Sequence, residues 1–425
     1  MKQNCESAHS MEHRAMEYSP GKQESAPRGR LIVPGLATGH TVFHWIVQSF
    51  VVALPEIQTA FQLNSVGVGG ILSARELASG LVALPGGVVV DILRRYWGQL
   101  LAACLGVAAV GCLVIGISPV YPLLLIGMAV VAVSHSIWHL PASASLSHHF
   151  PHRRGAVLAA HGVGGSVGDV AGPVVTGALL VFLGWRELIS AYAVIPFFMA
   201  AAAVWTFRNI GTTKEHKEQP TVAVSQRVEA TKRLLQSPAL WGLTAVRGFR
   251  AMALVALITI LPLYLGNELQ MGTAGRGFHV GLLIAVGLFA KPVAGLLSDR
   301  LGRKNVLVPG LLWSCLVALA LTIFDTGIPL TIMIALLGLF LYPDQPILTA
   351  AVFDVVGNEV ASTGLGIVAC VAFLMAVLSP IIAGVLYETW GFAATIYYIG
   401  SLFVAAALVF AALPLARAAG EQSAG

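Results

Sequence analysis

The sequence predicts an all-α polytopic membrane protein with twelve transmembrane helices in two six-helix halves. Three observations predict this fold: the composition, the number of apolar segments, and a repeat that relates the two halves. Of the 425 residues, 57% are hydrophobic and only 11% are charged, and the mean hydropathy is +0.81. Soluble proteins carry roughly 25% charged residues, so this chain has too few to cover a water-exposed surface. Soluble enzymes and nucleic-acid-binding proteins are therefore excluded.

The apolar segments are counted with a window of about 20 residues, the helix length that crosses the hydrocarbon core of a bilayer. Residues 1–30 precede them, are polar and carry both signs of charge, which predicts a disordered cytoplasmic tail rather than a cleaved signal. Because the number of spans is even, both termini lie on one side of the membrane. The twelve spans begin near Leu31, Val66, Trp97, Tyr121, Ala156, Leu188, Leu240, Phe278, Val306, Ile328, Ser362 and Phe392.

The longest polar interval between spans, residues 208–238, separates six spans from six and predicts a linker. Two motifs repeat across it: G-x-x-x-D occurs at 87–91 and 295–299, and P-x-x-x-G at 173–177 and 380–384. Both recur at nearly the same offset, which indicates a duplicated six-helix unit. The predicted organisation is a tail 1–30, a first half 31–207, a linker 208–238, a second half 239–415 and a cytoplasmic tail 416–425.

Lysine and arginine are unevenly distributed between the loops, and loops rich in these residues stay in the cytoplasm. The side opposite the termini has only Arg186 and Arg276. We therefore expect both termini in the cytoplasm and the chain in a plasma membrane, the inner membrane of a bacterium. The net charge of +5 reflects this topology and does not indicate a nucleic-acid partner. Basic residues on the side of the termini include Arg94, Arg95, Arg153, Arg154, Arg300, Arg303, Lys304 and Arg417.

The loop between the eighth and ninth spans, residues 295–304, reads GLLSDRLGRK. An aspartate at a helix end can meet the N-terminus of a neighbouring helix, while the cations hold the loop at the cytoplasmic face. The loop resembles the signature G-x-x-x-D-R-x-G-R-K/R of the major facilitator superfamily, and its first-half copy departs from it at Ile92 and Arg94. The alternative is a loop that only sets topology. The resemblance implies gating roles for Asp91, Arg95, Asp299, Arg300 and Arg303.

A narrower resemblance covers the fourth and fifth spans. Residues 138–143 read WHLPAS and are followed by RRG at 153–155 and GG at 164–165, a layout similar to fosmidomycin-resistance-type exporters, with departures at Leu140 and Ser166. The fifth span also repeats glycine every four residues before a proline, which resembles the superfamily's antiporter motif. Close packing of helices would explain the same glycines. Both resemblances imply export by antiport.

Charged side chains lie deep within the predicted spans. Exposing one to lipid costs roughly 3 kcal/mol on insertion scales, or about 20 kcal/mol for all of them. This exceeds the roughly 5–15 kcal/mol by which proteins are stable, so the charges must face one another or a water-filled cavity. Lys291, nearer the cytoplasm, can instead extend its amine to the interface. These residues are Arg75, Glu76, Asp169, Arg247, Arg250, Lys291 and Asp344.

Histidines add to this polar interior. His40 and His44, like His135 and His139, are four residues apart and share a helix face. A single histidine in a span is more often a packing residue, whereas two such pairs favour proton handling near neutral pH. Asp344 lies between two prolines that interrupt its helix, as helices are interrupted at transporter binding sites.

The arginines leave alternatives open. Arg247 and Arg250, three residues apart, can clamp a carboxylate or phosphonate, or can pair with Asp344 or Glu76. Arg75 and Glu76 can form an ion pair with other helices. We predict a substrate and proton site formed by His40, His44, Arg75, Glu76, His135, His139, Asp169, Arg247, Arg250 and Asp344.

These features predict secondary transport, in which two halves alternate access to a site near the midplane. No G-x-x-x-x-G-K-[ST] motif occurs, so ATP is not the driving force. We expect a proton-coupled transporter that exports a small anionic or zwitterionic organic solute by antiport, with uptake by proton symport as the alternative. We expect no enzyme activity, cofactor or metal site, and a monomer whose partners are the solute, protons and the lipid bilayer.

Two other classes of protein share some of these features. The histidine pairs, with His148, His149 and His152, are similar to the histidine boxes of membrane metalloenzymes. However, nothing in the sequence requires the histidines to converge on one ion. A protein that binds a solute without moving it is the third class.

Overall fold

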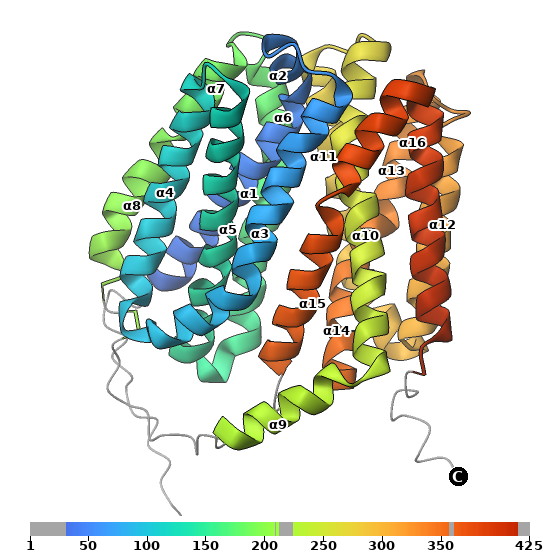
Figure 1. Ribbon diagram of the computed structural model, residues 1–425. Coiled ribbons are helices and arrows are strands. Elements are labelled where there is room, and N and C mark those ends of the chain that lie inside the picture. Colours follow the sequence, from blue (N-terminus) through green and yellow to red (C-terminus); the bar gives the residue numbers. More distant parts are fainter. Residues whose placement is uncertain (1–30, 209, 212–223, 357–360, 415–425) are drawn as a thin grey trace, which may run out of the picture.

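The computed structural model describes residues 31–208, 210–211, 224–356 and 361–414, and this part of the chain forms helices and no strands. Figure 1 shows most of these helices running side by side along the long axis of the molecule. The predicted all-α fold class is confirmed. The predicted tails and much of the linker lie outside the described residues.

The helices before the linker form one group, coloured blue to green in Figure 1. Helix α3 begins at Ser65 because the side chain of Asn64 accepts a hydrogen bond of 2.9 Å from the amide of Gly67. We call this the first group. It consists of α1 Ile32–Val52, α2 Leu54–Ala60, α3 Ser65–Ile92, η2 Arg94–Tyr96, α4 Trp97–Ile117, α5 Tyr121–His149, η3 Pro151–Arg153, α6 Arg154–Leu179, α7 Trp185–Tyr192 and α8 Val194–Thr206.

A second group follows, coloured yellow to red, and α9 lies across one end of the molecule below it (Figure 1). Helix α10 begins at Pro238, where the missing amide hydrogen of proline would have no helical partner, and Ser237 caps it. The bounds are α9 Val224–Leu235, α10 Pro238–Leu263, η4 Tyr264–Glu268, α11 Thr273–Leu301, α12 Arg303–Ala320, α13 Gly327–Leu341, α14 Asp344–Val356, α15 Ala361–Ala376 and α16 Ser379–Ala412.

The twelve predicted spans all coincide with helices. Nine helical segments of the described chain are long and apolar enough to cross a membrane. The last of these, residues 363–412, holds two spans because Gly391 breaks the helix with a φ of 79°. Helices α1 and α6, which carry histidines, glycines and Asp169, complete the twelve.

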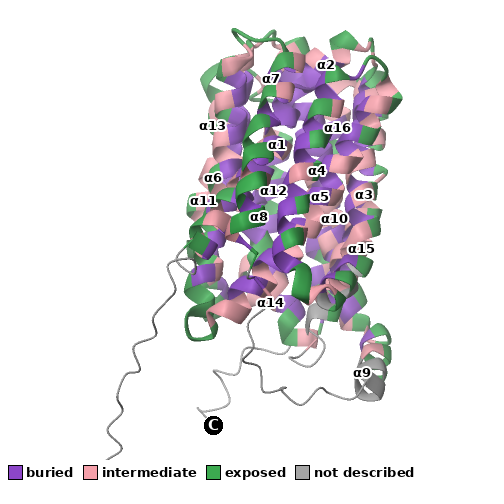
Figure 2. Cartoon of the chain, turned by 90° about the vertical axis from the view of Figure 1, so that its left-hand side faces the viewer, coloured by how far each residue is buried: buried purple, intermediate pink, exposed green. Residues whose placement is uncertain are grey.

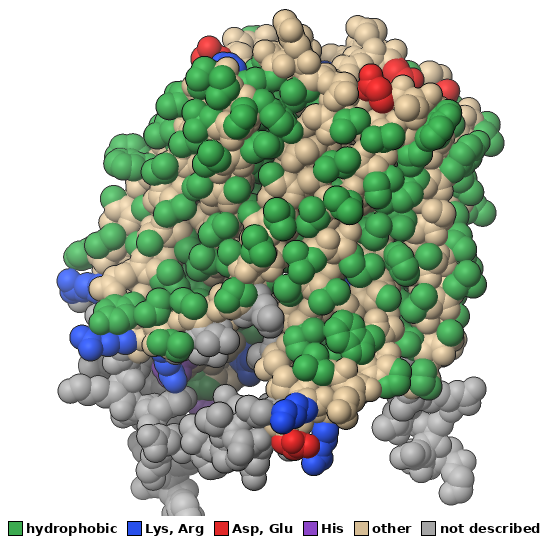
Figure 3. Space-filling view, viewed as in Figure 1, with side chains coloured by type: hydrophobic (Ala, Val, Ile, Leu, Met, Phe, Trp, Pro, Cys, Tyr) green, Lys and Arg blue, Asp and Glu red, His purple; other side chains and the backbone are tan. Residues whose placement is uncertain are grey.

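The outside of the bundle is suited to lipid. Exposed residues lie on its outer faces and buried residues fill its interior (Figure 2). Hydrophobic side chains cover the visible face along the length of the helices, whereas charged side chains appear at its two ends (Figure 3). This distribution matches lipid contact along the helices and water contact at both ends.

The two groups pack most closely at the end where α7 lies. There α6 and α11 cross at Gly177 and Gly277, so closely that a Cβ on either glycine would come 2.8 Å from the Cα of the other. Toward the end where α9 lies, a Cβ added to Gly87 of α3 or to Gly295 of α11 would meet no atom of another described helix within 4 Å. Figure 3 shows the surface hollowed between the two groups at this α9 end. The interior is therefore closed at the α7 end and open at the α9 end.

Candidate functional site

Five histidines from three helices of the first group lie in contact in the interior. His40 and His44 come from α1, His135 and His139 from α5, and His161 from α6. The ring centroid of His40 lies 4.5 Å from that of His44, 4.8 Å from that of His139 and 4.1 Å from that of His161. The Nε2 atoms of His135 and His139 are 3.0 Å apart. The two predicted pairs therefore converge, and we call these five residues the histidine cluster.

Hydrogen bonds determine which nitrogen each α1 histidine presents. His40 Nδ1 donates to the carbonyl oxygen of His161 over 2.7 Å, and His44 Nδ1 donates to Asp169 Oδ1 over 2.7 Å. Gln48 Nε2 donates to the same Asp169 oxygen over 3.1 Å. Because a carbonyl or a carboxylate only accepts, the proton is on Nδ1 and the lone pair of the neutral ring is on Nε2. In the described structure the Nε2 of His44 is buried and has no hydrogen-bond partner.

The glycines of α6 allow the cluster to form, because they bring α1 against the α6 backbone. A Cβ on Gly164 would collide with the carbonyl oxygen of Ala37 on α1, and a Cβ on Gly165 would lie 2.6 Å from the ring of His40. Thr41 Oγ1 strengthens the contact by donating to the carbonyl of Gly164 over 2.8 Å. The glycine repeat therefore packs helices, one of the two explanations that the sequence left open. Its role in antiport stays a prediction.

The second group contributes a buried ion pair between Arg250 on α10 and Asp344 at the start of α14. Arg250 Nε lies 3.0 Å and 2.7 Å from the two carboxylate oxygens, and the two residues are 7% and 1% exposed. Pro343 lies in the break between α13 and α14, where the carbonyl of Leu341 accepts a hydrogen bond of 2.6 Å from Arg250 Nη2. The predicted helix interruption thus positions Asp344 and supplies a further acceptor for Arg250.

Two more predicted residues, Arg75 and Glu76, pair with each other on α3. Arg75 Nε and Nη2 lie 2.9 Å and 2.6 Å from Glu76 Oε1. The sequence suggested pairing with other helices instead, but adjacent residues need no helix contact to meet. Glu76 is only 4% exposed, so its charge is balanced within the interior.

Two interior cations have no carboxylate within ion-pair distance among the described residues. Arg247 makes one long hydrogen bond, of 3.5 Å, to the hydroxyl of Thr349. The Nζ of Lys291 lies 5.9 Å from the centre of a tyrosine ring of the same group. Lys291 is also near enough to Asp169 and Asp344 to interact electrostatically with both. It therefore faces the space between the two groups rather than the interface to which the sequence allowed it to extend.

The loop between α11 and α12 brings Asp299 and Arg303 into an ion pair, and Arg303 Nε also lies 3.3 Å from a carboxylate oxygen of α14. Arg95 and Arg300 are exposed, and the side chain of Asp91 lies outside the described part. The partners of Arg303 all belong to the second group, so these contacts do not join the groups here. Gating by these five residues stays a prediction.

Polar contacts between the groups gather at the α7 end. Arg276 of α11 pairs with Glu56 of α2. The side chains of Asn267 and Gln58 share a hydrogen bond of 2.7 Å, and a backbone amide of α3 donates to Glu388 over 3.1 Å. We call these three interactions the α7-end contacts.

Sequence reasoning missed His161, Gln48 and the α7-end contacts. A signal for His161 existed, because it lies eight residues before Asp169, about two helical turns, and so shares its face. Gln48 similarly follows His44 by four residues. The α7-end contacts had no such signal, because they join segments far apart in sequence.

This fold and its charged interior can be compared with known proteins. A family model described as the Major Facilitator Superfamily matches residues 36–290 and 249–424. The chain belongs to this superfamily. The predicted membership is thereby confirmed.

Relatives of this superfamily member are transport proteins. It is 24% identical over 168 residues to the nitrite extrusion protein of Bacillus subtilis, covering 39% of this chain and only 39% of that protein. It is 21% identical over 395 residues to a "Probable hexose phosphate transport protein" of Chlamydia pneumoniae, covering 83% and 84%. A solved bacterial homolog of the human lysosomal transporter Spinster, inward-facing and unoccupied, superposes with a TM-score of 0.75 at 16% identity, covering 91% and 95%. The proteins that match this chain are transporters and not enzymes, which speaks against the metalloenzyme alternative.

Proposed function

We propose that this superfamily member couples the movement of a small anionic or zwitterionic solute to protons. One observation carries the proposal: the interior holds four cations and three carboxylates, and Arg247 and Lys291 are the cations without a carboxylate partner in the described part. Both residues are partly buried, and an unpaired charge that is partly removed from water is costly, so an anion that enters between the groups is stabilised by both. The relatives named for nitrite and hexose phosphate support an anion as the class of solute.

The coupling proton resides on the carboxylates near these cations. Asp169 shares a hydrogen bond with His44 and interacts electrostatically with Lys291. An anion held by Lys291 adds negative charge beside Asp169 and so favours its protonation, just as a proton there favours the anion. Solute and proton thus bind together, which supports symport. The proposed midplane site comprises the ten predicted residues with Lys291.

Antiport is the second candidate. The exporter-like residues from 138 to 165 and the relative named for nitrite extrusion favour export. In antiport, solute and proton bind in turn, so the electrostatic coupling just described would have to be overcome by a change of conformation. We propose a plasma membrane with both termini in the cytoplasm, which makes the open α9 end the cytoplasmic one.

The test is the sign of the pH change in proteoliposomes that contain a pH-sensitive dye. Nitrite, nitrate, a hexose phosphate and small organic phosphonates are added outside in turn, and protein-free liposomes correct for passive entry of the acid. Symport acidifies the lumen, antiport makes it alkaline, and solute flux without a pH change would contradict proton coupling.

A matched pair of lysine variants tests the anion site. We expect Lys291→Met to reduce solute flux about tenfold or more, because a hydrogen bond to a charged group is worth about 1.5–3 kcal/mol. Lys232→Met, on the exposed face of α9, should transport as well as the wild type. Equal flux in both variants would show that Lys291 does not bind the solute.

A further inference from the structure

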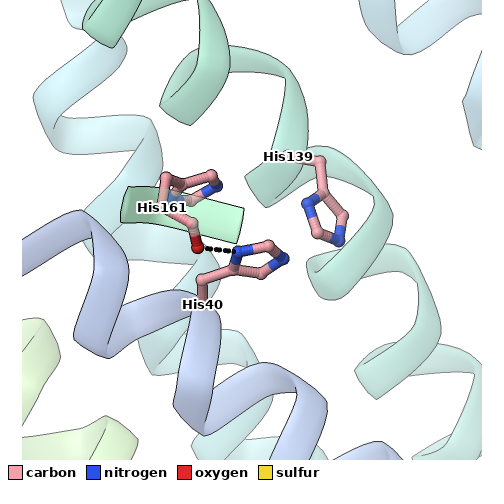
Figure 4. A group of neighbouring side chains, drawn as sticks. All are labelled: His40, His139 and His161. Atoms are coloured by element: carbon pink, nitrogen blue, oxygen red, sulfur yellow. Dashed lines mark hydrogen bonds between the residues drawn. The ribbon is translucent and has the colours of Figure 1, made fainter. Parts of the chain in front are cut away.

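The histidine cluster contains more imidazoles than transfer of a proton requires. Two sets of three offer ligand nitrogens that all lie within 4.8 Å of one another: His40, His139 and His161, and His44, His135 and His139. Figure 4 shows the first set, whose side chains come from α1, α5 and α6. The sets share His139, so a single ion would use one set or the other.

The His44 set has the hydrogen bonding typical of a metal site. A histidine that binds a metal through one nitrogen usually donates its other N–H to a carboxylate or a backbone carbonyl. His44 donates Nδ1–H to Asp169, and its Nε2 is buried without a partner in the described part. Gln48 donates to the same carboxylate oxygen and so helps to hold it in place. The lone pair of His44 Nε2 is therefore available to a metal ion, because no described protein group donates a hydrogen bond to it.

The α5 histidines complete this set with little movement. Their Nε2 atoms, in His135 and His139, are 3.0 Å apart. Two nitrogens at 2.0–2.1 Å from a tetrahedral ion are separated by about 3.3 Å. At present one of these rings donates its Nε2–H to the other. When an ion binds, that proton moves to Nδ1 of the same ring, so both Nε2 lone pairs face the ion and no net charge is lost.

The other set is less suited to a doubly charged ion. His40 donates its Nδ1–H to a neutral backbone carbonyl, so no carboxylate offsets the charge there. His161 is 4% exposed and makes no hydrogen bond of good geometry in the described structure, although the backbone of Leu36 lies near enough to interact with its ring. His44, His135 and His139 are each partly exposed as residues, although the Nε2 atom of His44 is itself buried.

We propose that His44, His135 and His139 bind a divalent d-block cation such as Zn²⁺. Asp169 orients His44 and partly offsets the charge of the ion without binding it directly. Imidazole nitrogens favour zinc, nickel and copper over magnesium or calcium. Three protein ligands leave a fourth position open to water or to a solute, as in zinc sites that are not purely structural. This inference does not depend on the identity of the transported solute.

The experiment measures Zn²⁺ binding to the purified full chain in detergent, by competition with a chromogenic chelator and by elemental analysis. Other histidines also take up zinc, so the readout is the difference between variants. We expect the wild type to bind one equivalent more than His135→Ala or His139→Ala, and Asp169→Asn to bind it about 10- to 100-fold more weakly. His161→Ala should keep the site.

His279→Ala is the matched control. His279 is a buried histidine of the second group, and both its ring nitrogens have partners, the carbonyl of Gly275 at 2.7 Å and the hydroxyl of Thr331 at 2.9 Å. It should bind as much Zn²⁺ as the wild type. If an alanine variant fails to fold, the glutamine variants His135→Gln and His139→Gln replace it.

Two results would overturn the proposal. Equal binding in the wild type and the His135 and His139 variants would show that the cluster holds no ion. Loss of binding in His161→Ala with retention in His135→Ala would assign the ion to the other set. Thermal unfolding gives an independent reading, since Zn²⁺ should raise the midpoint of the wild type and of His279→Ala but not of His135→Ala. None of these measurements involves transport, so their outcome is separate from that of the proposed function.

Discussion

At the scale of single residues, we expect disruption of the ion pair between Arg250 and Asp344 to lower the stability of the fold more than disruption of any other ion pair described above. Both side chains are buried, and removing one partner leaves an uncompensated charge, which costs about 3–5 kcal/mol. We expect Asp344→Asn to lower the free energy of unfolding by that amount, measured by denaturant titration in detergent. The double variant Arg250→Met with Asp344→Leu should recover most of the loss, because no unpaired charge remains.

An exposed ion pair in the same group provides the control for this prediction. The side chain of Asp354, which pairs with Arg303, is 56% exposed. Exposed pairs are worth about 0–1 kcal/mol, so Asp354→Asn should change stability by no more than that. If Asp344→Asn were as mild as Asp354→Asn, the interior around Arg250 would have to be filled with water rather than closely packed.

At the scale of helices, the crossing of α6 and α11 depends on glycine. A Cβ on Gly177 would come 2.8 Å from the Cα of Gly277, closer than side chains tolerate. We expect Gly177→Ala to force the helices apart and to cost about 1–3 kcal/mol in the free energy of unfolding, the usual range for overpacking. Gly162→Ala on the same helix should cost no stability, since the added Cβ would meet no atom of another described helix within 4 Å and alanine favours a helix by about 1 kcal/mol. If Gly177→Ala left the free energy of unfolding unchanged, the two groups would have to move apart at this crossing without loss of stability.

The helices also show what could be predicted from the sequence. Hydropathy, proline and glycine act locally, so the twelve spans and the break before Asp344 could be predicted. Contacts between helices could not be predicted in this way. The spacing of four residues places His40 and His44 on one face of their helix, but it does not show that histidines of α5 and α6 pack against that face. Arg250 had two acidic candidates within the spans, and only the packing of α10 against α14 selects Asp344, while Glu76 is paired with its own neighbour.

At the scale of the whole molecule, the two groups are joined at the α7 end and separated at the α9 end. The proposed transport also requires the opposite arrangement, in which the α7-end contacts are broken. The contacts are suited to this exchange, because they are few and polar and water can replace them once the end opens. Their combined strength then sets how much of the population is closed at the α7 end.

The ion pair between Glu56 and Arg276 offers a direct test of this balance. Glu56→Gln removes the charge, and since a hydrogen bond to a charged group is worth about 1.5–3 kcal/mol, the ratio of open to closed molecules at the α7 end should rise about tenfold or more. Spin labels at Ala60 and Ala274, exposed positions of the first and second groups, would report this as a longer distance in pulsed electron paramagnetic resonance, after replacement of the native cysteines.

The control for this measurement is Glu229→Gln. Glu229 forms an exposed ion pair with Arg233 within α9, at 3.6 Å, and joins no two parts of the bundle. Its removal should leave the distance distribution unchanged, because the two conformations contain that pair equally. If Glu56→Gln also left the distribution unchanged, the balance between conformations would have to be set by the glycine crossing of α6 and α11, and Gly177→Ala would then be the variant that shifts it.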